Sequence, residues 1–134
     1  MAAAPQFAVT PRIGAVSVAT ADSFGQASWS SSTTPTNFGT VLTGVTAGTR
    51  INEVVIKSAA TSAAAVVRLF LYDGTTYWLF DEVQIAAVTG SSTLANNRVT
   101  RTYDNLVLPS SSWSLRATTS VSQTTHVTAL GADL

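Results

Sequence analysis

A stretch of 20 residues with a glycine turn near its centre constrains the fold of this chain most strongly. Two apolar, aromatic-rich runs, residues 66–72 and 77–85, flank the dipeptide Asp73-Gly74. Glycine readily adopts the positive φ that a tight turn between antiparallel strands requires. The pattern therefore predicts a β-hairpin, with antiparallel strands over these two runs.

Alternation along the predicted hairpin assigns its side chains to two faces. Val67, Leu69 and Leu71 point one way, and we expect this aliphatic set in the core. We expect the other face to be aromatic and to need cover from a second layer or a partner. Its expected members are Phe70, Tyr72, Trp78 and Phe80.

The composition of the whole chain favours strands over helices. Val, Ile and Thr together number 40, whereas Lys, Glu, Gln and Met together number 8. β-Branched side chains pack well on a pleated sheet, while the straight-chain residues favour helices. The further expected strands are residues 12–20, 38–44, 49–58 with a bulge near Asn52, 98–103, 106–108, 112–119 and 126–134. About eight short antiparallel strands predict an all-β sandwich of the jelly-roll type.

The chain divides into an N-terminal arm and one domain. Residues 1–11 contain Pro5 and Pro11, and each proline keeps its predecessor out of the helical region, so we expect an extended arm. We expect residues 12–134 to form a single β-sandwich domain. A long polar connection over residues 21–37 carries Trp29, and connections of this length are often functional.

Charge and cysteine content exclude several classes of function. Lys plus Arg is 7 and Asp plus Glu is 7, so the chain lacks the basic excess of nucleic-acid binders and of polybasic membrane surfaces. The absence of cysteine excludes disulfides, zinc–thiolate sites and thiol nucleophiles. The N-terminus does not resemble a secretory signal, so we expect synthesis in a cytoplasm. A net charge of zero is unusual for a free monomer and favours a place in an assembly.

The polar residues offer few groupings that support catalysis or metal binding. His126 is the single histidine, and we interpret it as a half-exposed strand residue rather than a general base. Asp81 and Glu82 are adjacent and should point to opposite faces of a strand. Asp73 and Asp104 are typical turn residues, and a calcium site built from them is the less favoured alternative. We therefore expect no enzyme activity, no metal and no cofactor.

A sugar-binding surface is a further alternative. Trp29, Tyr77 and Trp78 are the aromatic residues that could stack on a sugar ring. For each of them, packing in the core or at an interface is the favoured interpretation.

From Thr49 onward, about two-thirds of the chain resembles small virion proteins of tailed bacteriophages. The similar segments are Thr49-Arg-Ile-Asn-Glu-Val-Val-Ile, Val67-Arg-Leu-Phe-Leu-Tyr-Asp-Gly and Trp113-Ser-Leu-Arg-Ala, set among neutral Ser/Thr-rich strands. Within that group, the chain looks most like the jelly-roll capsid decoration, or cement, proteins. The resemblance rests on the overall pattern of residues rather than on a diagnostic motif, so it assigns no functional residue to this chain.

The resemblance implies a non-enzymatic homo-oligomer on the capsid exterior of a virion. Its implied partners are the major capsid protein and copies of the chain itself. A phage tail or fibre module and a carbohydrate-binding β-sandwich remain the alternatives. We predict Phe7 and Trp29 as the partner-interface residues, because both aromatics lie in segments too polar or too proline-rich to be core strands.

Overall fold

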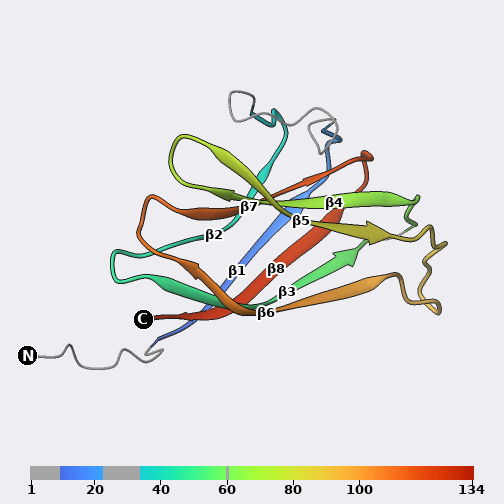
Figure 1. The fold of residues 1–134 in the computed structure, drawn as a ribbon. Coiled ribbons are helices and arrows are strands. Elements are labelled where there is room, and N and C mark those ends of the chain that lie inside the picture. The colour runs from blue at the N-terminus through green and yellow to red at the C-terminus, as the bar shows by residue number, and fades with distance from the viewer. Residues whose placement is uncertain (1–9, 23–33, 60) are drawn as a thin grey trace, which may run out of the picture.

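The computed structural model describes residues 10–22, 34–59 and 61–134, and these residues form strands and connecting turns without a helix. The predicted all-β class is thus confirmed. The strands are β1 (Thr10–Val18), β2 (Gly39–Thr43), β3 (Thr49–Ser58), β4 (Ala65–Tyr72), β5 (Tyr77–Ile85), β6 (Arg98–Leu108), β7 (Ser114–Thr119) and β8 (Thr125–Asp133) (Figure 1).

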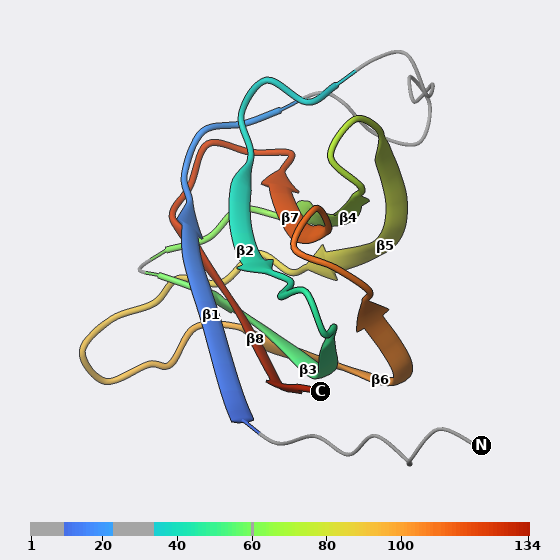
Figure 2. The ribbon, with the colours of Figure 1, turned by 90° about the vertical axis from the view of Figure 1, so that its left-hand side faces the viewer.

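The eight strands form two four-stranded antiparallel sheets that pack face to face (Figure 2). One sheet has the order β1-β8-β3-β6 and the other has the order β2-β7-β4-β5. Consecutive strands lie in opposite sheets, except that β4 and β5 form a hairpin within one sheet. This double Greek-key connection is the jelly-roll topology, as predicted.

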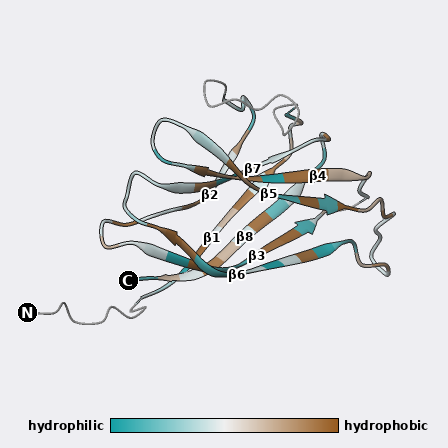
Figure 3. Ribbon diagram, in the orientation of Figure 1, coloured by the Kyte–Doolittle hydropathy of each residue, from teal (hydrophilic) through white to brown (hydrophobic). Residues whose placement is uncertain are grey.

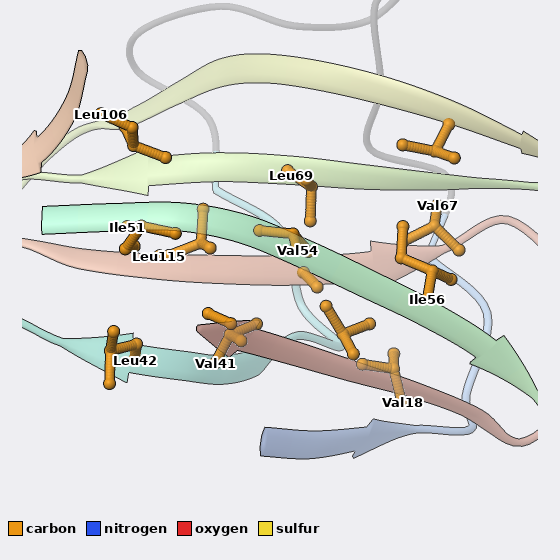
Figure 4. Close-up of a cluster of buried hydrophobic side chains, with 14 of the residues drawn as sticks. Val18, Val41, Leu42, Ile51, Val54, Ile56, Val67, Leu69, Leu106 and Leu115 are labelled. Atoms are coloured by element: carbon orange, nitrogen blue, oxygen red, sulfur yellow. The ribbon is translucent and has the colours of Figure 1, made fainter. Parts of the chain in front are cut away.

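The core lies between the two sheets and is built from side chains of both. Hydrophobic and hydrophilic residues alternate along the strands, as a sheet with one buried face requires (Figure 3). Val54 and Ile56 come from the first sheet, and Val67 and Leu69 come from the second (Figure 4). Val127 of β8 adds to the core from the first sheet. All five are fully buried, so the prediction of a core position is confirmed for Val67 and Leu69. Leu71, the third member of the predicted aliphatic set, is only half-buried and packs against the edge of the core.

The hairpin is formed as predicted by Asp73-Gly74. β5 has the predicted bounds and β4 begins one residue earlier, at Ala65. Gly74 has a φ of 104°, which explains why a glycine occupies this position. The bulge predicted near Asn52 is also present, because the pairing of β3 with both neighbours shifts between Ile51 and Glu53.

The predicted aromatic face of the hairpin is wrong in part. A register shift places Leu69 opposite Asp81 and Phe70 opposite Leu79, so Phe80 is an extra residue in β5. The extra residue reverses the alternation along β5. Phe70 and Tyr72 of β4 face outward as predicted, together with Tyr77 of β5. Trp78 instead lies opposite Leu71, on the other face, and Phe80 turns toward the other sheet, where it contacts Tyr103 at a ring-centroid distance of 5.1 Å.

Several strand ends differ from the prediction by one or two residues, and two differences change how the chain is divided. β1 begins at Thr10, because Thr10 and Pro11 pair with Asp133 and Ala132 of β8, so these two residues belong to the sheet rather than to the arm. β6 is one strand instead of two short ones, because β3 pairs with it on both sides of a bulge. The predicted Asp104-Asn105 turn lies in that bulge.

The sheets approach each other most closely where β1 meets β2. A Cβ atom on Gly14 would lie 2.1 Å from the carbonyl oxygen of Val41, and one on Gly39 would lie 2.7 Å from a methyl group of Val16. Arg12 adds a hydrogen bond across this corner, from Nη2 to the carbonyl oxygen of Thr43 at 3.0 Å. Glycine at positions 14 and 39 therefore allows β1 and β2 to pack closely on this side of the sandwich.

Candidate interaction surfaces

The outer face of the β1-β8-β3-β6 sheet is a broad surface whose residues follow from the strand register. Residues that alternate with the buried core positions point outward, in rows that cross all four strands. The central row is Ala15, Thr128, Val55 and Thr100, and the next row begins with Ile13 and Leu130. We call these six residues the neutral strip.

The neutral strip combines exposure with the absence of charge among its own side chains. Ile13 is 71% exposed, and the other five members are exposed or half-buried. Charged side chains lie at its borders. Lys57 and Arg98 share the row on one side with His126, and Glu53 follows Leu130 in the row of Ile13, before Thr102. The strip is thus an uncharged surface patch with charged residues at its borders.

An open cleft of about 560 Å³ adjoins the row of Lys57 and His126. It lies between the ends of β3 and β8 and the loop that precedes β6. Lys57 Nζ donates to the carbonyl oxygen of Asn96 at 2.9 Å and so holds this loop against the sheet. His126 is exposed on β8, in agreement with its interpretation as a strand residue at the surface.

A second groove, of about 460 Å³, lies where the edge strands β5 and β6 face each other. Phe80 and Val107 line this β5–β6 groove and are each 39% exposed. Leu71 and Leu106 also line it. The bulge in β6, over residues 103–105, supplies most of the polar lining.

One cluster of polar side chains bridges the two sheets at this groove. Tyr103 Oη donates to Asp81 Oδ2 at 2.8 Å, and Arg101 Nε lies 3.5 Å from the same oxygen. Burial, together with the hydrogen bond and the negative charge of Asp81, raises the pKa of the Tyr103 phenol above its ordinary value. Tyr103 is therefore a neutral donor at physiological pH, and its hydrogen bond links β6 to β5.

Asp81 and Glu82 lie on opposite sides of β5, as predicted. Glu82 Oε1 lies 3.4 Å from Arg68 Nε on the outer face, whereas Asp81 contacts Tyr103 of the other sheet. The two carboxylates thus have separate partners.

The outer face of the β2-β7-β4-β5 sheet carries an aromatic cluster around Arg116. The Arg116 Cζ atom lies 3.9 Å from the ring centroid of Tyr72 and 4.5 Å from that of Phe38, and Nη1 donates to Tyr77 Oη. Burial raises the pKa of Tyr77 above its ordinary value, although the charge and the hydrogen bond of Arg116 act in the opposite direction. Tyr77 is only 5% exposed, so its ring does not form the stacking surface that a sugar would need.

The Asp73 carboxylate accepts hydrogen bonds from within the hairpin. This role in the turn is the one that we favoured over calcium binding. Its Oδ1 atom accepts from the backbone N–H groups of Thr75 and Thr76, and its Oδ2 atom accepts from Trp78 Nε1. These hydrogen bonds, that from the Thr76 backbone most of all, hold the pKa of Asp73 below its ordinary range. Asp104 lies in the β6 bulge. Within the part of the chain that the structure describes, no three His, Asp or Glu side chains gather as a metal site.

The predicted interface residues Phe7 and Trp29 lie outside the described residues. Neither the neutral strip nor the Arg116 cluster was predicted, because both bring together strands that are distant in sequence. The alternation of residues 13, 15 and 17 with glycine and valine is the local signal that points to an outward row on β1. In the described segments, no helix is long and apolar enough to cross a membrane.

Comparisons with known proteins assign no family to this chain. No family model matches the chain, and no curated protein matches it. Among solved structures, it is similar to a chain in the crystal structure of the T13 IBDV viral particle, with 17% sequence identity and a TM-score of 0.35. The match is to a viral particle protein. It covers 99% of this chain and 34% of the viral one, so this chain spans about a third of its length. Similarity this low assigns neither a family nor a function.

Proposed function

We propose that this protein is a non-enzymatic virion protein of a tailed bacteriophage, and that it binds the outer surface of the capsid as a decoration, or cement, protein. The neutral strip carries the proposal. Ile13 is 71% exposed on it, and apolar side chains exposed within an uncharged surface mark contacts with other proteins. Burial of one such side chain stabilises a complex by about 1.5–3 kcal/mol.

The side chains of the strip suit a contact that is repeated many times. Ala15 has no rotamers to lose on binding, and the β-branched Val55 and Thr128 are already restricted at χ1. The entropy cost of immobilising them is therefore small. Weak contacts of this kind gain strength when many copies engage one shell, because multivalent attachment raises the effective concentration.

The partners in this proposal are the major capsid protein and further copies of the chain. Phe7 and Trp29, which lie outside the described residues, remain proposed interface anchors. Because the strip itself carries no charge, its contact with the shell should depend only weakly on salt. An electrostatic contact through Lys57 and Arg98 would instead weaken steeply as salt is added.

The proposal is tested by placing a charge in the strip. We expect Val55→Arg and Thr128→Arg to weaken co-sedimentation with purified heads that lack the protein by about tenfold or more, because burying an unpaired charge costs several kcal/mol. The matched control is Leu94→Arg, since Leu94 is 55% exposed on the loop before β6. If both strip variants bind as tightly as the control, the strip is not the contact surface.

A further inference from the structure

The β5–β6 groove has an apolar floor and a polar rim whose main groups are already satisfied. Phe80 and Val107 line it and are each 39% exposed in total, although Phe80 also packs on Tyr103. Tyr103 Oη donates to Asp81, and Arg50 Nη2 donates to the carbonyl oxygen of Asp104 at 2.7 Å. An uncharged segment can therefore enter the groove without leaving these hydrogen-bonded groups unpaired.

The sequence before β1 has the matching chemistry. Residues 1–9 read Met-Ala-Ala-Ala-Pro-Gln-Phe-Ala-Val, with no charged side chain and one large ring, Phe7. Pro5 disfavours a helical conformation at the residue before it. An extended chain presents alternate side chains to a groove and its backbone to the rim, which is a common mode of peptide recognition.

The chain also enters β1 at the end of the sheet where the groove lies. Thr10 pairs with Asp133, Asp133 pairs with Thr49, and Thr49 pairs with Leu108, so Thr10 and Leu108 share one row. Leu108 directly follows Val107, which lines the groove. Three strand spacings separate the two ends of this row, about 14 Å. Nine extended residues span up to about 30 Å, so the reach is sufficient.

We propose that residues 1–9 of one copy bind in the β5–β6 groove of a neighbouring copy, with Phe7 packed against Phe80 and Val107. A neighbouring copy is favoured because Thr10 is already extended within β1, and Pro11 disfavours a helical turn at Thr10. To reach the groove of its own copy, the chain would have to turn sharply at Thr10. It would then have to cross the sheet end, which Leu134 covers by donating to the carbonyl oxygen of Gly48 at 3.0 Å.

Binding of the arm of one copy in the groove of the next would join the copies into an oligomer. Each copy offers one arm and one groove, so the contact joins two different surfaces, and it gives a reciprocal pair or a ring where the rotation between copies closes. The contact is a property of the isolated protein and is independent of shell binding. It can fail while the proposed function holds, and the reverse is equally possible.

The test is the native mass of full-length variants, measured by sedimentation or light scattering. We expect the wild-type chain to form a closed oligomer, and Phe7→Ser and Val107→Arg each to fall to the 13.9 kDa monomer. Mixing these two variants should restore association, because the first supplies an intact groove and the second an intact arm. Leu94→Arg is the control and should keep the wild-type mass.

Each other outcome overturns the inference. A monomeric wild-type chain would mean that the arm binds its own copy or another protein. An oligomer that survives both substitutions would be held by a different surface, and variants that fail to reassociate when mixed would have no complementary arm and groove. Thr102→Arg is a second groove variant at an exposed position, and circular dichroism of all variants checks that they are folded.

Discussion

Arg12 Nη1 donates to both carboxylate oxygens of Asp133, at 3.0 Å and 3.1 Å, and so joins the first strand of the sandwich to the last. Thr49 Oγ1 donates to the same carboxylate at 2.8 Å, which adds β3 to the cluster. Partial burial raises the pKa of Asp133, but the hydrogen bonds from Thr49 and Arg12 and the charge of Arg12 outweigh it. The pKa of Asp133 therefore lies below its ordinary value.

This lowered pKa predicts a loss of stability in acid. A carboxyl group with a depressed folded-state pKa contributes stability above its unfolded pKa of about 4, and that stability is lost as the pH falls through the folded pKa. We expect Asp133→Asn to lower the free energy of unfolding at neutral pH, with a smaller difference from wild type below about pH 3. Urea denaturation at the two pH values measures this. A difference that stays constant with pH would show that the charge of Asp133 does not stabilise the fold.

The core assignment predicts a large effect at Leu69. This side chain is fully buried between the sheets. Leu69→Ala should lower the free energy of unfolding by about 2–5 kcal/mol, because it removes buried methyl groups and leaves a cavity. Leu94→Ala is the matched control at a side chain that is 55% exposed, and it should change stability by less than about 0.5 kcal/mol. A similar small change at Leu69 would contradict its place in the core.

The hairpin shows what local sequence can predict and where it fails. Asp73-Gly74 predicted the turn and the bounds of β5, because a positive φ is a local requirement. The alternation of side chains along the hairpin predicted the wrong face for Phe80. The register shift between Leu69 and Phe70 is set by how β5 fits against β4 and the opposing sheet, and not by local sequence. A single extra residue reverses every assignment beyond it.

The candidate surfaces were harder to predict than the strands. The neutral strip exists because β1 lies beside β8, and β8 lies beside β3, although more than 100 residues separate Ile13 from Leu130 in the sequence. Such pairings depend on topology rather than on local preference. The clustering of Arg116 with Phe38 and Tyr72 likewise requires β7, β4 and the residue directly before β2 to lie close together.

The aromatic cluster predicts a change in the titration of Tyr77. Burial raises the pKa of this phenol, and the charge and hydrogen bond of Arg116 partly oppose that effect. Arg116→Met should therefore raise the pKa of Tyr77 further, because it removes the opposing positive charge. Tyrosine ring resonances followed by NMR through alkaline pH measure the shift. Arg68→Met is the control, since Arg68 pairs with Glu82, and an equal shift in that variant would argue against a specific effect of Arg116.

We propose that the protein covers the outside of a capsid shell. The most direct measurement is saturation binding of the full-length protein to purified heads that lack it, with the bound copies counted and located in a particle map. The account predicts copies on the order of hundreds per particle, arranged on the capsid exterior with the β1-β8-β3-β6 sheet against the shell. A handful of copies at the tail, or no binding to heads, would contradict it.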